Sequence, residues 1–139
     1  MAAFHAAVAA SEPDALLIDA LRRPLVEGAV SQFRPGARVH YTYLLAVLPS
    51  GLQFWQYTER PALIAEIPRA SITDVGPESI MNDRLPILGV AISIIDPAGN
   101  PTELPFLPLR PAHPLLFVRS DDIPALIDSI RQKLGMPLA

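Results

Sequence analysis

The segment Ser120–Gly135, SDDIPALIDSIRQKLG, decides the fold, because it carries the clearest helix signals in the chain. Two aspartates stand near its start, and Pro124 falls in the first turn, where a missing N–H costs nothing. Gly135 followed by Pro137 is typical of a helix end. Apolar residues recur at helical spacing, which predicts one stripe that packs on an apolar surface. The stripe consists of Ile123, Leu126, Ile127, Ile130 and Leu134.

The residues before this helix are predicted to supply that surface as a series of short strands. Apolar, aromatic and β-branched runs alternate with turns rich in Pro, Gly, Asn and Asp. No helical pattern separates the runs, so the sheet is predicted to be antiparallel and meandering. Pro105 and Pro108 predict that their strand is irregular or lies at a sheet edge. The seven strand candidates are residues 37–48, 52–57, 62–67, 70–75, 87–95, 102–109 and 115–118.

The N-terminal region predicts a further helix over Glu12–Arg23. Ser11 begins a capping pattern, and Pro13 suits the first turn. Leu17 and Leu21 would share one apolar face. We therefore expect an N-terminal extension with a helix over residues 1–28 and the main domain over residues 29–139, with 28–33 as a short strand or a linker.

Two segments resemble bacterial pleckstrin-homology-like domains. Residues Arg34–Val39, RPGARV, are similar to the opening of these domains, and Glu66–Val75 carries a similar I-P-x-x-x-I-x-x-V pattern. The resemblance covers residues 34–135 and implies a mainly β domain: a seven-stranded, antiparallel, partly open barrel capped by the C-terminal helix. The N-terminal helix would be an addition. The first hairpin turn, Leu48–Leu52, carries no charge, so phosphoinositide binding is not expected.

Composition narrows the classes of function. The chain has 139 residues, of which 50% are hydrophobic and 18% are charged, and its net charge is −3. This charge argues against binding to nucleic acid and against peripheral contact with an anionic membrane. No apolar run reaches the ~20 residues of a membrane span, and the N-terminus lacks the basic region of a signal peptide. We therefore expect a cytoplasmic protein.

Catalytic and metal-binding patterns are missing from the sequence. His5, His40 and His113 lack the spacing of metal ligands, and the chain contains no cysteine. No nucleophile motif or phosphate-binding glycine loop is present. The aromatic residues of two predicted strands are interpreted as core and cross-strand packing, in preference to a platform for bases or a ligand; they are Tyr41, Tyr43, Phe54, Trp55 and Tyr57. The sequence thus predicts a protein that is not an enzyme and holds no cofactor.

The remaining candidate site is the stretch from Glu78 to Pro86, which has no clear period and is predicted to be a loop. Ile80 and Met81 would either fold back over the barrel or form an exposed apolar pair beside Arg84, a composition that suits a protein partner. The leading hypothesis is a non-enzymatic protein-interaction or assembly module that binds a protein partner or self-associates through an unpaired strand edge. The alternative is a carrier that holds a small apolar molecule or lipid in the barrel.

Overall fold

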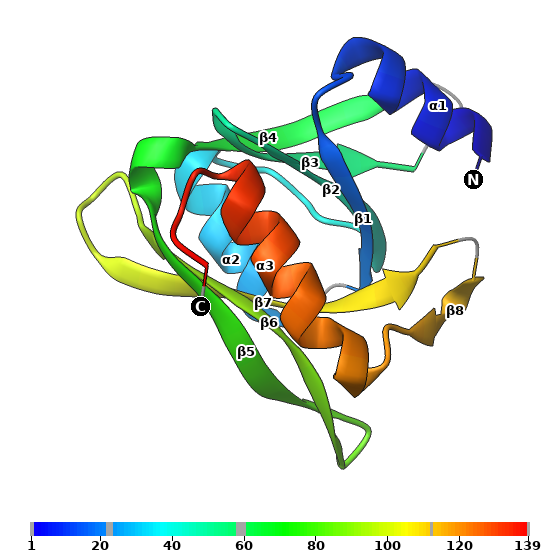
Figure 1. Cartoon of the computed structure of the whole chain (residues 1–139). Helices are drawn as coiled ribbons and strands as arrows, with labels where there is room; N and C mark the ends of the chain where they lie inside the picture. The colour runs from blue at the N-terminus through cyan, green and yellow to red at the C-terminus, as the bar shows by residue number, and fades with distance from the viewer. Residues whose placement is uncertain (1, 22–23, 58–60, 112, 139) are drawn as a thin grey trace.

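The computed structural model describes residues 2–21, 24–57, 61–111 and 113–138, and it consists of a curved antiparallel sheet with helices packed against it (Figure 1). In chain order its elements are α1 (Ala2–Ser11), β1 (Leu16–Leu21), α2 (Pro24–Phe33), β2 (Thr42–Leu48), β3 (Gly51–Gln56), β4 (Ala62–Pro68), η1 (Arg69–Ser71), β5 (Ile72–Asn82), β6 (Leu85–Ile95), β7 (Pro101–Arg110), β8 (His113–Phe117), η2 (Ser120–Asp122) and α3 (Ile123–Lys133).

The sheet is made of two antiparallel meanders joined at one place. The strand order is β4-β3-β2-β1-β7-β6-β5, and β8 pairs with β7. The two meanders, β1–β4 and β5–β8, meet where Ala20 and Leu21 of β1 pair with Pro108 and Leu107 of β7. The outermost strands of this order, β4 and β5, are linked only by the short turn η1, so the sheet curls without closing. The predicted mainly β, antiparallel, partly open architecture is confirmed.

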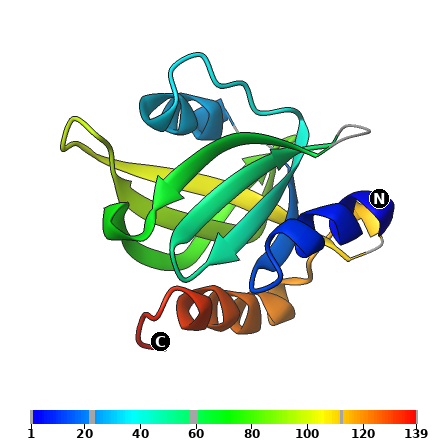
Figure 2. The same ribbon diagram turned by 90° about the horizontal axis from the view of Figure 1, so that it is seen from above.

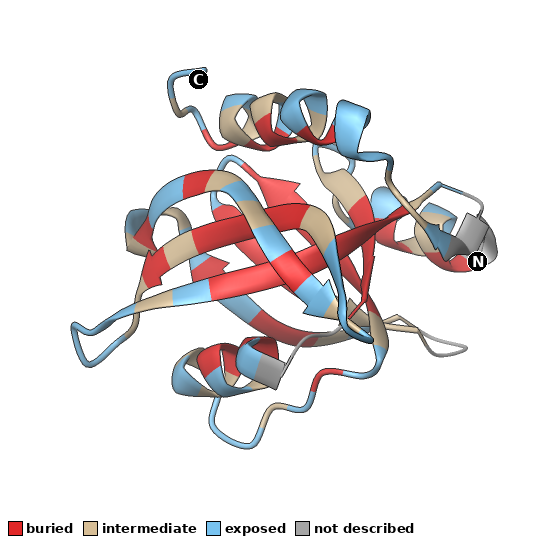
Figure 3. Ribbon diagram, turned by 90° about the horizontal axis from the view of Figure 1, so that it is seen from below, coloured by how far each residue is buried: buried red, intermediate tan, exposed pale blue. Residues whose placement is uncertain are grey.

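The inner face of the curved sheet holds the main core. Helices α2 and α3 lie at opposite ends of the curled sheet (Figure 2), and the buried residues gather between them (Figure 3). The predicted stripe of α3 faces this core, with Leu126 at its margin. Helix α2 contributes apolar residues of its own, a contribution that the sequence did not predict. The core residues from the two helices are Val26, Ala29 and Val30 of α2 and Ile123, Ile127, Ile130 and Leu134 of α3.

Helix α3 ends as its sequence predicts but begins differently. Gly135 has a φ of 73°, and its N–H donates to Gln132 O at 3.1 Å. The next N–H, of Met136, donates to Arg131 O at 2.8 Å, which completes a Schellman motif. At the other end Ser120–Asp122 forms a 3₁₀ turn, and the side chain of Asp122, the N-cap residue, makes no capping hydrogen bond.

The predicted helix over Glu12–Arg23 is wrong. Half of that range is strand β1, whereas the helices are α1 before it and α2 after it; residues 22–23 lie outside the described part of the chain. Ile18 and Ala20 of β1 face the core, while Leu17 on its other face packs under α1. A strand covered on both faces is apolar on both faces, so its residues also matched a helical stripe. Residues 28–33 are likewise helical, as part of α2.

The predicted loop at 78–86 is also wrong, because these residues complete a long β5–β6 hairpin. Strand β5 continues through Gly76 and Pro77 to Asn82, and β6 begins at Leu85. The two residues of the turn, Asp83 and Arg84, have φ of 48° and 68°. Two-residue hairpin turns of this hand are usually marked by glycine, and none stands here.

The two prolines of β7 lie inside the sheet and not at its edge. Pro105 pairs with Ala91 of β6, and Pro108 pairs with Ala20 of β1. The carbonyl of Pro108 accepts a hydrogen bond from Val118 N at 2.9 Å, on its β8 side. In an antiparallel ladder the N–H and C=O of one residue point the same way, so the N–H that Pro108 lacks would not have bonded to β1.

Candidate functional site

The structure does not bring the three predicted site residues into one surface. Ile80 is only 7% exposed and packs with Leu21 and Leu107 in a small cluster, so Ile80 folds back onto the sheet and does not form an exposed pair with Met81. Successive residues of a strand point to opposite faces, and Met81 is 56% exposed. Arg84 is exposed in the hairpin turn. The hairpin therefore presents Met81 and Arg84 without Ile80.

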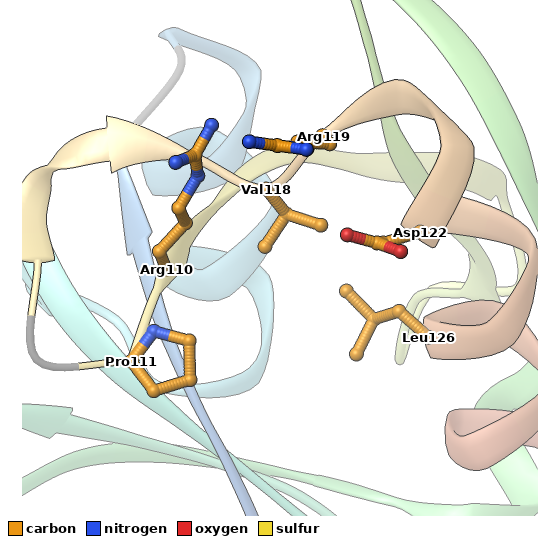
Figure 4. Close-up of a pocket in the computed structure, with 6 residues that line it drawn as sticks. All are labelled: Arg110, Pro111, Val118, Arg119, Asp122 and Leu126. Carbon is orange, nitrogen blue, oxygen red and sulfur yellow. The ribbon is translucent and has the colours of Figure 1, made fainter.

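A second candidate site is a groove between the end of β7 and the start of α3. We call it the arginine groove; its volume is about 440 Å³. Figure 4 shows two arginines at its upper rim, aliphatic side chains below them and a carboxylate on the α3 side. It is lined by Arg110, Pro111, Val118, Arg119, Asp122 and Leu126.

The short β7–β8 hairpin brings the two arginines together. Arg110 is the last residue of β7, and Arg119 follows the end of β8 after one intervening residue, Val118. Arg110 Nε donates to Phe117 O at 2.9 Å, which fixes its guanidinium beside the returning strand. Arg119 is exposed, and its guanidinium makes no hydrogen bond or ion pair with any residue that the structure describes. One cation is thus held by the backbone, and the second is available to a ligand.

The floor of the arginine groove is aliphatic. Val118 and Leu126 are half-buried and pack on their inner side against the main core. Pro111, in the β7–β8 turn, extends this floor on the side of Arg110 (Figure 4). Cations above an apolar floor can bind an anionic group and an aliphatic side chain at the same time.

Sequence reasoning missed this groove, although one signal was present. The sequence pattern predicts strands over residues 102–109 and 115–118, with an extended loop over 110–114 between them, and it places Leu126 in the apolar stripe of α3. Arg110 and Arg119 flank a short segment that contains a predicted strand, and a hairpin brings its flanking residues together. Two cations at such positions could have been predicted to share one surface.

A second polar cluster lies under α1 and is structural. His5 Nε2 lies 2.8 Å from Asp19 Oδ1, and the Tyr57 hydroxyl donates to the same oxygen. Asp19 is only 4% exposed. Phe4 of α1 packs on Tyr57 with ring centroids 4.7 Å apart. This cluster attaches α1 to the outer face of the sheet.

The other aromatic and histidine predictions have mixed outcomes. Tyr43 and Phe54 are buried, and Trp55 packs under α1, as predicted for core and cross-strand packing. Tyr41 is 67% exposed, so the packing prediction is wrong for that residue. His40 is exposed just before β2, outside the strand in which we expected it.

Within the described ranges no three His, Asp or Glu side chains are grouped so that they could hold a metal ion. No helix there has the length and apolarity to cross a membrane. In comparisons with protein-family models, with curated proteins and with solved structures, the chain matches none, so the pleckstrin-homology-like resemblance stays a prediction.

Proposed function

We propose that the protein is a non-enzymatic interaction module and that the arginine groove receives a segment of a partner protein. The observation that carries the proposal is the position of Arg119. Its exposed guanidinium has no partner among the described residues and stands over the aliphatic floor formed with Val118 and Leu126. Arginines beside apolar pockets are typical of the residues that dominate protein–protein contacts.

The packing of the sheet favours this function over the carrier alternative. A carrier needs space inside the barrel for its cargo. The inner face here is filled by large side chains that are less than 2% exposed, and α2 and α3 add further apolar residues from two sides. These side chains include Tyr43, Phe54, Phe106, Leu45, Ile92 and Leu104.

Hydrogen bonds at the sheet edges favour a partner in the groove over self-association through strands. Arg34 donates to Leu63 O at 2.9 Å and to Ile64 O at 2.7 Å on the outer strand β4. Arg131 donates to Val75 O at 2.9 Å on the other outer strand, β5. Carbonyls that already accept hydrogen bonds from arginine are poor templates for an added strand.

Site-specific crosslinking in the native cells tests the proposal. A photo-crosslinking amino acid at Leu126 is expected to capture one discrete protein, while the same amino acid at Ala98, in an exposed turn away from the groove, is not. The captured protein, identified by mass spectrometry, must then bind the purified chain and lose that binding with Arg119→Glu. Capture from Met81 but not from Leu126 would instead place the interaction at the β5–β6 hairpin.

A further inference from the structure

We infer that the arginine groove binds an acidic peptide segment in which a carboxylate is followed by an aliphatic side chain. This inference rests on the proposed function, because it names the chemistry of the partner segment. Three features of the groove carry it: the paired cations, the aliphatic floor and the single carboxylate opposite the cations.

The paired cations select a carboxylate. In Figure 4 the guanidinium groups of Arg110 and Arg119 lie at the same rim of the groove, although like charges repel each other. An anion bound between them relieves that repulsion. Arg110 uses its Nε for Phe117 O, which leaves its terminal nitrogens for a ligand, and Arg119 offers its whole guanidinium. The planar guanidinium matches the two oxygens of a carboxylate.

The aliphatic floor selects the neighbouring side chain of the segment. Val118, Leu126 and Pro111 offer carbon surface and no side-chain hydrogen-bonding group below the arginines. A Leu, Ile or Val side chain that covers this surface removes it from water, which favours binding. A second charged side chain at the same place would lose its hydration without a partner.

Asp122 determines the orientation of the bound segment in the arginine groove. It stands on the α3 wall, on the far side of Val118 from Arg110 (Figure 4), and it is exposed. Its carboxylate repels a second acidic group at that end and accepts hydrogen bonds from N–H groups of the segment. A peptide carries a carboxylate, an aliphatic side chain and N–H groups in close succession. An anionic lipid surface carries one kind of charge, which Asp122 and the net charge of −3 oppose.

Fluorescence anisotropy with defined peptides and the full chain tests this inference. The probe is a labelled peptide in which a Glu-Glu pair is followed by Leu, and its controls replace the pair by Gln-Gln or the Leu by Ser. We expect saturable binding of the first peptide and about tenfold weaker binding of each control. Arg119→Gln is expected to weaken the first peptide by about tenfold as well. Arg84→Gln, an exposed arginine outside the groove, is the matched control and should leave the affinity unchanged.

Several outcomes would overturn the inference while leaving the proposed function standing. Equal affinity for the Glu-Glu and Gln-Gln peptides would show that the groove does not recognise the negative charge of the peptide. Binding that is lost with Arg84→Gln but kept with Arg119→Gln would move the site to the hairpin. Binding to phosphatidylserine vesicles but not to the peptides would replace the peptide by a lipid surface. If crosslinking from Leu126 finds a partner whose bound segment is basic, only the acidic assignment fails.

Discussion

At the scale of single residues, the buried carboxylate of Asp19 shows how α1 is attached to the sheet. It is almost fully buried and is held by His5 from α1 and Tyr57 from the end of β3. A buried carboxylate is tolerated only when its oxygens are hydrogen-bonded. The two contacts therefore stabilise both the carboxylate and the position of α1.

Removing one donor tests this account. Tyr57→Phe leaves Asp19 with fewer hydrogen bonds in a buried setting, and it is expected to lower the free energy of unfolding by about 1–3 kcal/mol. Tyr41→Phe is the matched control, because Tyr41 is 67% exposed, and its effect is expected within about 0.5 kcal/mol. Urea denaturation measures both. Equal effects of the two substitutions would contradict a supporting role for Tyr57.

Glu78 is a residue whose charged form is destabilised in the folded protein. Its Oε2 is buried and makes no hydrogen bond with any of the described residues. Burial, and secondly the negative charge of Glu103, raise the pKa of Glu78 above its ordinary value of 4.5. When folding raises the pKa of a carboxyl group, the folded protein is most stable with that group protonated. The contribution of Glu78 to the free energy of unfolding is therefore lost as the pH rises above 4.5, its ordinary pKa.

Glu78→Gln is therefore expected to raise the melting temperature at pH 7, and the gain should shrink when the pH is lowered below the ordinary pKa of glutamate. Thermal denaturation followed by circular dichroism across this pH range measures the difference. Glu103→Gln removes only the smaller cause, so its gain should be smaller. A destabilising effect of Glu78→Gln at pH 7 would show that the charged form makes a favourable contact.

At the scale of elements, the sequence predicted those that obey one period and missed those that do not. Helix α3 has one apolar stripe and a glycine terminus, so its pattern and its structure agree. Strand β1 is covered by α1 on one face and by the core on the other, which removes the alternation that marks a strand. The β5–β6 turn at Asp83 and Arg84 adopts positive φ without glycine, so no residue marked it. The arginine groove could not be predicted without the pairing of β7 with β8, because that pairing brings Arg110 and Arg119 to one surface.

Two arginines bind the end of α3 to the strands beneath it. Arg69 Nε donates to Leu134 O at 2.6 Å, and Arg131 donates to Val75 O at 2.9 Å and to Asp74 Oδ1 at 2.7 Å. The hydrogen bond from the Arg131 guanidinium lowers the pKa of the Asp74 carboxyl group below its ordinary value. The carbonyls at the end of a helix lack partners within the helix, so Arg69 supplies one for Leu134.

Arg131→Ala is expected to lower the free energy of unfolding by about 1–3 kcal/mol, because it removes the donor to a β5 carbonyl that α3 partly covers. Lys133→Ala, in the same helix turn, is the control. Lys133 reaches the exposed Asp14 at 3.3 Å, and such surface pairs contribute about 0–1 kcal/mol. Chemical denaturation of the two variants compares them directly. A Lys133 effect as large as that of Arg131 would show that α3 is held by general charge and not by this contact.

At the scale of the whole molecule, the open sheet has two outer strands, and each is a possible site of strand addition. Arg34 donates to the β4 carbonyls of Leu63 and Ile64, beside an irregularity in the β3–β4 register. Arg69 and Arg131 donate to the β5 carbonyls of Ile72 and Val75. Basic side chains and irregular pairing are the usual means by which an edge strand avoids a second chain.

The wild-type chain is therefore expected to be a monomer at micromolar concentration, and Arg34→Ala is expected to move it toward a dimer by freeing the carbonyls of β4. Size-exclusion chromatography with light scattering measures the mass of both over a range of concentrations. Arg38→Ala is the control. Arg38 is also an exposed arginine and lies four residues after Arg34 in the sequence, and its substitution is expected to leave the mass unchanged. A wild-type dimer that Arg119→Glu leaves intact would show that the molecule assembles through its edges, whereas one that Arg119→Glu disrupts would make a second copy the occupant of the groove.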